Sequence, residues 1–149
     1  MKSFKELLEE KTRIRLTEPG RHIALNMILD GASKLAKNAQ VEVAKEHIIA
    51  ATRAEIAATE KAIELIKSKS GDASKYLTDL KHYTEFLGEQ WSESKIRTEL
   101  EGLLSTMDDS EKIKKNMKNI MLAVMATWEE DIDKIDQKIV NRILASMLT

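Results

Sequence analysis

The sequence contains no cysteine, and only one proline and five glycines occur among its 149 residues. Without cysteine the chain can form no disulfide, no thiolate metal site and no cysteine nucleophile, which fits a cytosolic protein. The scarcity of proline and glycine leaves few places at which a helix must end, while Ala, Leu, Ile, Met, Lys and Glu dominate. The composition therefore predicts an all-α protein.

Long hydrophobic runs are also missing. No segment approaches the roughly 20 consecutive apolar residues that a membrane helix needs. The first ten residues turn acidic at Glu6, Glu9 and Glu10, where a secretory signal peptide would have an apolar stretch. We therefore expect a soluble, cytoplasmic protein with no membrane partner.

Neither sign of charge is in excess. The chain has 24 Lys and Arg residues and 25 Asp and Glu residues, which gives a formal net charge of -1. A protein that coats nucleic acid by neutralising phosphates usually carries a strongly basic surface. The balance argues against that class and leaves open binding through a local basic patch.

Caps and breaks divide the chain into seven predicted helices. The longest has isoleucines every seven residues, at Ile49, Ile56 and Ile63. Thr52, Thr59 and Ile66 lie near the alternate seam positions, and the pattern predicts a packing edge like that of a coiled coil. Asp108, Asp109 and Ser110 are the expected caps of the sixth helix. The first four helices cover about 2–15, 19–37, 43–69 and 72–87, and the last three carry apolar stripes within 96–104, 113–125 and 135–147.

The clearest interruption of helical patterning lies within residues 84–100. Gly88 suits the C-cap of one helix, because glycine enters the left-handed conformation without a steric penalty, and Ser92 suits the N-cap of the next. The pattern predicts an N-terminal four-helix lobe over residues 1–90, with a long helix hairpin, joined to a C-terminal three-helix lobe over residues 91–149. We expect the lobes to hinge around Gly88 and Ser92.

Residue patterns typical of catalysis are not found. His22, His47 and His82 fall on different predicted helices without a metal-binding pair, so ordinary exposed or half-buried positions are the simpler interpretation. An acidic cluster from Glu129 to Asp136 either binds a hard cation or caps the last helix, and the lack of EF-hand spacing favours capping. We predict no catalytic residue, no metal, no cofactor and no small-molecule substrate.

Six basic residues form the candidate nucleic-acid surface. Four lysines follow one another closely before and within the sixth helix, and two further cations belong to the last helix. The alternative is a solvated helix face, because nearby acidic residues dilute the field. Trp91 and Trp128 are expected to be buried between the lobes rather than exposed for stacking on a base. The six cations are Lys112, Lys114, Lys115, Lys118, Lys138 and Arg142.

Five sequence blocks follow one another along nearly the whole chain. They are 25–28, 53–56 with 62–64, 85–93, 118–121 and 136–140. In order and in residues these blocks are similar to segments of the YqeY-like family. Residues 25–28 are similar to L-R-M-L, residues 53–56 with 62–64 to R-x-E-I with S-I-E, and residues 85–93 to E-Y-L-P-x-Q-L-S-E. Residues 118–121 are similar to G-K-V-M, and residues 136–140 to D-G-K-L-V. The fold of that family also forms the C-terminal tail of the GatB subunit of the tRNA-dependent amidotransferase. The resemblance therefore implies an all-α unit of this kind.

The chain departs from the family pattern at several positions. Gly88 stands where the family prefers proline, which leaves the expected hinge looser. Lys118 and Gln137 replace glycines, and Ala126 replaces a second proline. Residues 57–59, Ala-Ala-Thr, stand where the family has basic side chains, so one surface that would face phosphates is neutral here.

The GatB tail contacts the outer part of tRNA, so the resemblance implies a non-catalytic module that binds tRNA or a tRNA-handling protein through the basic face of the C-terminal lobe. It implies no amidotransferase chemistry, because the catalytic parts lie in other domains and subunits. The alternative hypothesis is a protein-interaction or structural helical module that binds no nucleic acid. Such a module would use a face of the long third helix or the lobe interface.

Overall fold

The computed structural model describes residues 1–149, which form α-helices and short 3-10 helices joined by loops. It contains no β-strand, which confirms the predicted all-α class. None of the helices combines the length and the apolar character that crossing a membrane requires. The chain divides into two compact units, Met1–Gly88 and Glu89–Thr149, and each is described by itself.

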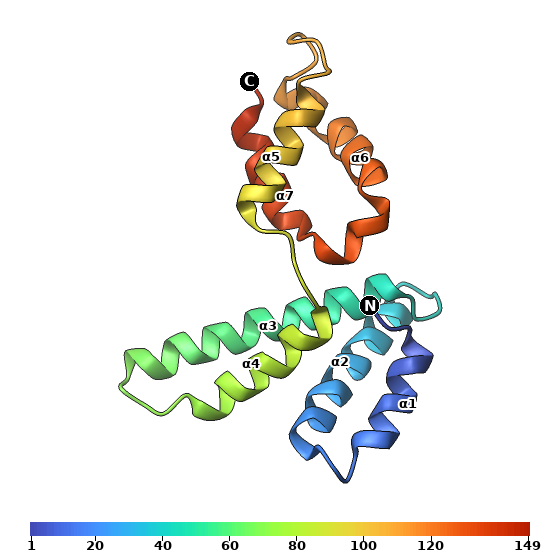
Figure 1. The fold of residues 1–149 in the computed structure, drawn as a ribbon, viewed down its shortest axis with the longest axis vertical. Coiled ribbons are helices and arrows are strands. Elements are labelled where there is room, and N and C mark those ends of the chain that lie inside the picture. Colours follow the sequence, from blue (N-terminus) through green and yellow to red (C-terminus); the bar gives the residue numbers. More distant parts are fainter. The chain divides into compact units, whose positions relative to one another are not determined.

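The Met1–Gly88 unit is built from two antiparallel helix pairs, α1 with α2 and α3 with α4 (Figure 1). Ser3 caps the first helix by accepting a hydrogen bond from the amide of Glu6 at 3.2 Å. Pro19 begins the second, because the first helical turn does not use its amide nitrogens as intrahelical donors. The bounds are α1 Phe4–Ile14, α2 Pro19–Asn38, α3 Lys45–Ser68 and α4 Ser74–Leu87.

Helix α2 is central to this unit and contacts α1, α3 and α4. It lies close to α3 at Gly31, where an added Cβ would stand 3.1 Å from the Cβ of Ala51. A glycine that faces an alanine lets the two helix backbones approach, so the helices are tightly packed at this point. The buried residues of this core are Leu7, Ile14, Ala24, Leu25, Ile28, Leu29, Ala32, Ile48, Ala51 and Tyr83.

The buried edge of α3 differs from the predicted one. Ile63 is buried as expected, but Ile49 and Ile56 are only half-buried. Ile48 and Ala51 take the core positions instead. Because Gly31 of α2 contacts Ala51, the side of α3 that carries Ile48 and Ala51 faces the core. The seven-residue isoleucine repeat therefore predicted the buried side only in part.

Thr52 and Thr59, predicted near the alternate seam positions of this helix, are buried on α3 as expected. Thr52 Oγ1 donates to the carbonyl of Ile48, and Thr59 Oγ1 donates to the carbonyl of Glu55, both at 2.7 Å. A buried hydroxyl is costly only when it lacks a partner. These bonds to the preceding turn let α3 bury both threonines without such a loss.

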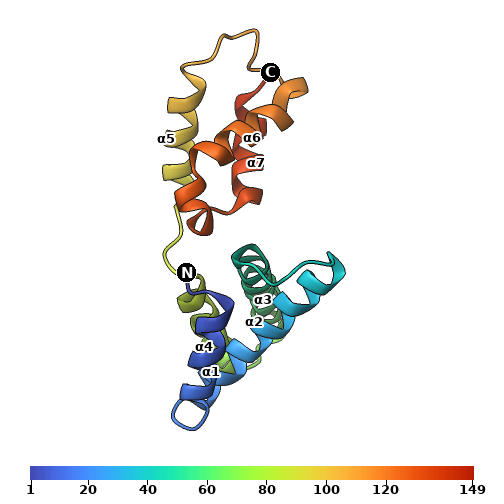
Figure 2. The same cartoon turned by 90° about the vertical axis from the view of Figure 1, so that its right-hand side faces the viewer.

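The Glu89–Thr149 unit combines three α-helices with two 3-10 helices. Helix α5 packs on α7, and α6 contacts α7 and both 3-10 helices. In the turned view of Figure 2, α6 passes in front of α7. The bounds are α5 Glu93–Leu104, η1 Lys114–Asn116, α6 Met117–Thr127, η2 Glu129–Lys134 and α7 Gln137–Met147.

Helix α6 begins later than predicted. Asp108, Asp109 and Ser110 lie in the loop before it and do not cap it, because helical structure resumes only with η1 at Lys114. The backbone amide of Thr149 donates to the carbonyl of Lys112 at 3.1 Å. The C-terminal end of the chain thus holds this loop in place, through a contact that local patterning does not reveal.

Trp128 belongs to the core of this unit, and the half-buried Trp91 packs against that core. The rings of Trp91 and Trp128 meet edge to face, with centroids 5.2 Å apart and an angle of 61° between their planes. Trp128 is 5% exposed, and the Nζ of Lys95 lies 4.4 Å from the centroid of the Trp91 ring. Trp128 is therefore buried as predicted, within this unit, whereas Trp91 is only half-buried, and packing of the two rings between the lobes stays a prediction. The other buried residues are Ile96, Leu100, Leu104, Ile120, Val124, Ile135, Val140, Ile143, Leu144 and Leu148.

Candidate nucleic-acid interface and a basic pocket

The segment that joins the two units carries both predicted caps. The amide of Gly88 donates to the carbonyl of Thr84 at 3.0 Å, and the φ of Gly88 is 82°, which favours glycine. Its ψ of -171° is extended, so Gly88 lies outside the left-handed helical region that the C-cap prediction assumed. Ser92 caps α5 as predicted and accepts from the amide of Lys95 at 3.1 Å. A hinge at Gly88 and Ser92 stays a prediction.

Three of the six candidate cations lie close together, at the passage from η1 to α6. Lys114, Lys115 and Lys118 are all exposed, and none is ion-paired. Four residues of helix span roughly 6 Å, so the three side chains leave the backbone within about one helical turn. These three lysines, together with Lys138 on α7, are the candidate cations that no carboxylate neutralises.

The other three cations are placed differently. Lys112 is ion-paired with Asp109 at 3.2 Å, and Arg142 is ion-paired with Glu93 of α5. Lys138 is exposed in the first turn of α7, whereas the chain after the last turn of α7 is bonded to Lys112. The length of α7 places these two ends roughly 15 Å apart. The structure therefore does not gather all six residues around one point.

The charge of each unit also bears on binding. The Glu89–Thr149 unit has nine Lys and Arg residues against twelve Asp and Glu residues, a net charge of -3. The Met1–Gly88 unit has fifteen against thirteen, a net charge of +2. Lys114, Lys115 and Lys118 can therefore attract a phosphate only locally. The net negative charge of the Glu89–Thr149 unit opposes this attraction.

The three histidines occupy separate places. His22 Nδ1 lies 3.0 Å from the carbonyl of Lys11, and His47 Nδ1 accepts from the amide of Ala44 at 2.9 Å at the start of α3. His82 Nδ1 is buried without a hydrogen-bond partner. No group of three or more histidine, aspartate or glutamate side chains is arranged to hold a metal ion.

The acidic cluster divides into two parts. Glu129 to Lys134 form the 3-10 helix η2, which was not predicted from the sequence. Asp136 then caps α7, and its side chain accepts from the amide of Lys138 at 3.0 Å. Capping is therefore confirmed for Asp136, while most of the cluster belongs to a short helix of its own.

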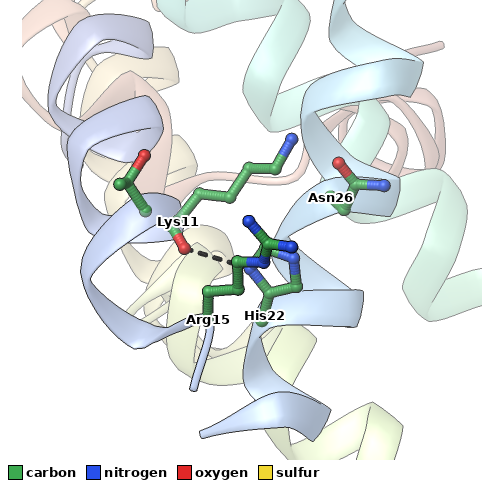
Figure 3. Close-up of a pocket in the computed structure, with 5 residues that line it drawn as sticks. Lys11, Arg15, His22 and Asn26 are labelled. Atoms are coloured by element: carbon green, nitrogen blue, oxygen red, sulfur yellow. Dashed lines mark hydrogen bonds between the residues drawn. The ribbon is translucent and has the colours of Figure 1, made fainter. Parts of the chain in front are cut away.

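A pocket of about 410 Å³ opens between α1 and α2 of the Met1–Gly88 unit (Figure 3). Two cations, Lys11 and Arg15, come from the end of α1, and His22 and Asn26 come from α2. Lys11, His22 and Asn26 are half-buried, whereas Arg15 and Thr12 are exposed. Figure 3 shows the Lys11 side chain extending toward Asn26, and the Arg15 guanidinium in front of His22. The pocket therefore combines positive charge with hydrogen-bonding groups.

This pocket was not predicted from the sequence, although its residues carry a recognisable signal. Lys11 and Arg15 are four residues apart, as are His22 and Asn26, and side chains at that spacing share a helix face. The turn between the two helices is short, which favours an antiparallel pair. Which face of α1 turns toward which face of α2 depends on packing, and only the structure supplies it.

The sequence was compared with models of protein families and with curated proteins, and neither comparison finds a match.

Proposed function

We propose that the chain is a non-catalytic helical module of the YqeY-like kind that binds tRNA, or a protein that handles tRNA, through the Glu89–Thr149 unit. Two considerations support the proposal: the resemblance of five sequence blocks to that family, and one structural observation. The observation is the group of exposed, unpaired lysines at the start of α6, Lys114, Lys115 and Lys118.

The arrangement of these lysines suits contact with a nucleic-acid backbone. Such contact needs cationic side chains that are exposed and not already neutralised by carboxylates. Lys112 and Arg142, which are ion-paired, would contribute less. Because the unit as a whole carries a net charge of -3, we expect weak binding that depends strongly on salt.

Fluorescence anisotropy with labelled tRNA, measured over a series of salt concentrations, tests the proposal. The double substitution Lys114→Glu and Lys115→Glu should lower the affinity. It should also reduce the slope of log K against log salt by about one for each lysine. Circular dichroism should be unchanged, since both side chains are exposed.

Lys138→Glu is the matched control. It changes the charge of the same unit by the same amount per residue, but it lies at the other end of α7 from the loop that precedes the three lysines. We expect it to lower the affinity less than Lys114→Glu alone. The proposal fails if tRNA does not bind at low salt. It also fails if Lys138→Glu weakens binding as much as Lys114→Glu or Lys115→Glu does.

A second candidate function is protein interaction without nucleic acid. Leu65, near the end of α3, and Tyr76 and Leu77, in the first turn of α4, are exposed at the same end of the α3–α4 hairpin. Large apolar side chains that gather on a surface often mark an interaction site. This group favours a partner that binds the hairpin end.

Affinity purification from an RNase-treated extract tests the second candidate. A stoichiometric protein partner should be recovered with the natural chain and lost after Leu65→Glu with Leu77→Glu. Leu122→Glu, at an exposed position of α6 in the other unit, is the control and should leave the partner bound. Recovery that is insensitive to the hairpin substitutions would reject this binding site.

A further inference from the structure

The pocket between α1 and α2 brings together cations that the rest of the chain does not neutralise. Neither Lys11 nor Arg15 has an ion-pair partner, whereas Arg21, only one turn into α2, pairs with both Glu10 and Glu85. Lys11 is also half-buried. A partly desolvated ammonium group next to a second cation is unfavourable unless an anion offsets it.

The polar groups of the pocket have defined hydrogen-bonding roles. A backbone carbonyl only accepts, so the contact of His22 with the carbonyl of Lys11 requires a proton on Nδ1. This bond holds the ring against α1 and leaves Nε2 without a partner in the chain. The Asn26 amide likewise makes no hydrogen bond within the chain, whereas Thr12 Oγ1 already donates to the carbonyl of Leu8 at 3.2 Å.

The donors that remain are the ammonium of Lys11, the guanidinium of Arg15 and the amide of Asn26. A guanidinium has a planar set of donors that matches the oxygens of a phosphate, and an ammonium adds a point charge. A phosphate monoester carries about −1.5 to −2 charges near neutral pH and three acceptor oxygens. Its charge and oxygens therefore correspond to the two cations and the free amide.

Two exposed apolar side chains lie one helical turn from residues that line the pocket. Leu8 is three residues before Lys11 on α1, and Ile23 is three residues before Asn26 on α2, so each is a neighbour on the helix surface. Both are exposed, Ile23 by 64%. They offer contact area to the organic part of a ligand but add nothing to the binding of a bare inorganic ion.

We propose that the pocket lined by Lys11, Arg15, His22 and Asn26 binds the phosphate group of an organic phosphate monoester, whose organic part packs on Leu8 and Ile23. Lys11 and Arg15 provide the charge, Asn26 donates to a phosphate oxygen, and His22 sets the spacing between α1 and α2. The site lies in the Met1–Gly88 unit and shares no residue with the lysines proposed to contact tRNA. The test of this site is therefore independent of the test of tRNA binding.

Two-dimensional 15N–1H NMR of the full chain, with phenyl phosphate as the probe and inorganic phosphate as the second arm, tests the site. Amide shifts should be confined to residues 8–15 and 22–26, and phenyl phosphate should bind more tightly than inorganic phosphate. Lys11→Gln and Arg15→Gln should each weaken phenyl phosphate binding by about tenfold, since each removes a charged hydrogen bond.

Arg13→Gln is the matched control, because Arg13 is an exposed arginine of the same helix that does not line the pocket. It should leave the affinity unchanged. The site is rejected if no saturable shifts arise at millimolar probe, or if Arg13→Gln weakens binding as much as Arg15→Gln. Equal affinity for phenyl phosphate and inorganic phosphate would overturn the assignment of an organic ester. The amide spectra of the variants also show directly whether each one is folded.

Discussion

The buried carboxylate of Glu10 accepts a hydrogen bond from the guanidinium of Arg21, with Oε1 and Nη2 2.9 Å apart. Lys2 donates to the other carboxylate oxygen at 2.7 Å. Arg21 also donates to Glu85 at 3.2 Å and lies over the ring of Phe86, 4.6 Å from its centroid. A single carboxylate with two cationic partners thus links α2 to α1, and Arg21 extends the link to α4.

This carboxylate should make stability depend on pH. Burial on its own raises the pKa of Glu10, but hydrogen bonds from Lys2 and Arg21 and their charges outweigh it, so the pKa lies below the usual 4.5. As the pH falls, Glu10 is therefore protonated at a higher pH in the unfolded chain than in the folded chain. The stability that Glu10 contributes is fully present above about pH 4.5 and is lost as the pH falls through the lowered pKa.

Denaturant unfolding at several pH values, compared with Glu10→Gln, measures this contribution. The natural chain should be more stable than the variant by about 1–3 kcal/mol near neutral pH, and the difference should shrink in acid. Glu9→Gln, at an exposed neighbouring position, is the control and should change little. A difference for Glu10→Gln that is constant down to strongly acidic pH would contradict the assignment.

Two glycines with open space around them should respond oppositely to alanine. An added Cβ meets nothing within 4 Å at Gly88 or at Gly102. Gly88 has a positive φ, so Gly88→Ala should destabilise by about 1–3 kcal/mol through the backbone alone, and Gly88→Pro by more. Gly102 lies inside α5, so Gly102→Ala should stabilise by about 0.5–1 kcal/mol. Thermal unfolding of the variants tests both signs, and a stabilising Gly88→Ala would be inconsistent with the φ of 82°.

The tryptophan pair should dominate the stability of the Glu89–Thr149 unit. Trp128→Ala removes a buried ring and should cost about 3–5 kcal/mol, whereas Leu122→Ala, at a 64% exposed position of α6, should stay within about 0.5 kcal/mol. Both tryptophans belong to this unit, so fluorescence follows its unfolding separately. Unfolding of Trp128→Ala is then followed by the remaining Trp91. Equal effects of the two substitutions would mean that the pair is not part of the core.

Tyr83 should impose a limit on stability in alkali. Burial, followed by the charges of Glu55 and Asp79, raises its pKa from 10.0 to about 12. Because the folded pKa is the higher one, its contribution is present below about pH 10 and is lost as the pH rises toward about 12. Unfolding measured across this range should depend less on pH in Tyr83→Phe, and Tyr76→Phe, which removes an exposed phenol, is the matched control. An unchanged alkaline dependence in Tyr83→Phe would contradict the expectation.

Local signals predicted the helices best where caps and breakers act within a few residues. The second helix was predicted from Pro19, and α2 begins there; Ser92 was predicted as a cap, and it caps α5. The prediction was wrong for the start of α6, where Asp108 resembles a cap but lies in a loop held by Thr149, 37 residues beyond Lys112. A long-range bond of this kind leaves no trace in a short window of sequence.

The sequence by itself determined that the chain is helical and where many of its helices begin and end, because helix propensity and capping act between near neighbours. The tertiary structure decided which side of each helix is buried and which of its polar side chains find a partner on a neighbouring helix. The packing of α2 on α3 turned Ile48 inward, Glu93 neutralised Arg142 from 49 residues away, and the pairing of α1 with α2 brought Lys11 to His22. Periodicity defines a face on one helix, but the charges and donors that remain free on that face depend on the neighbouring helix.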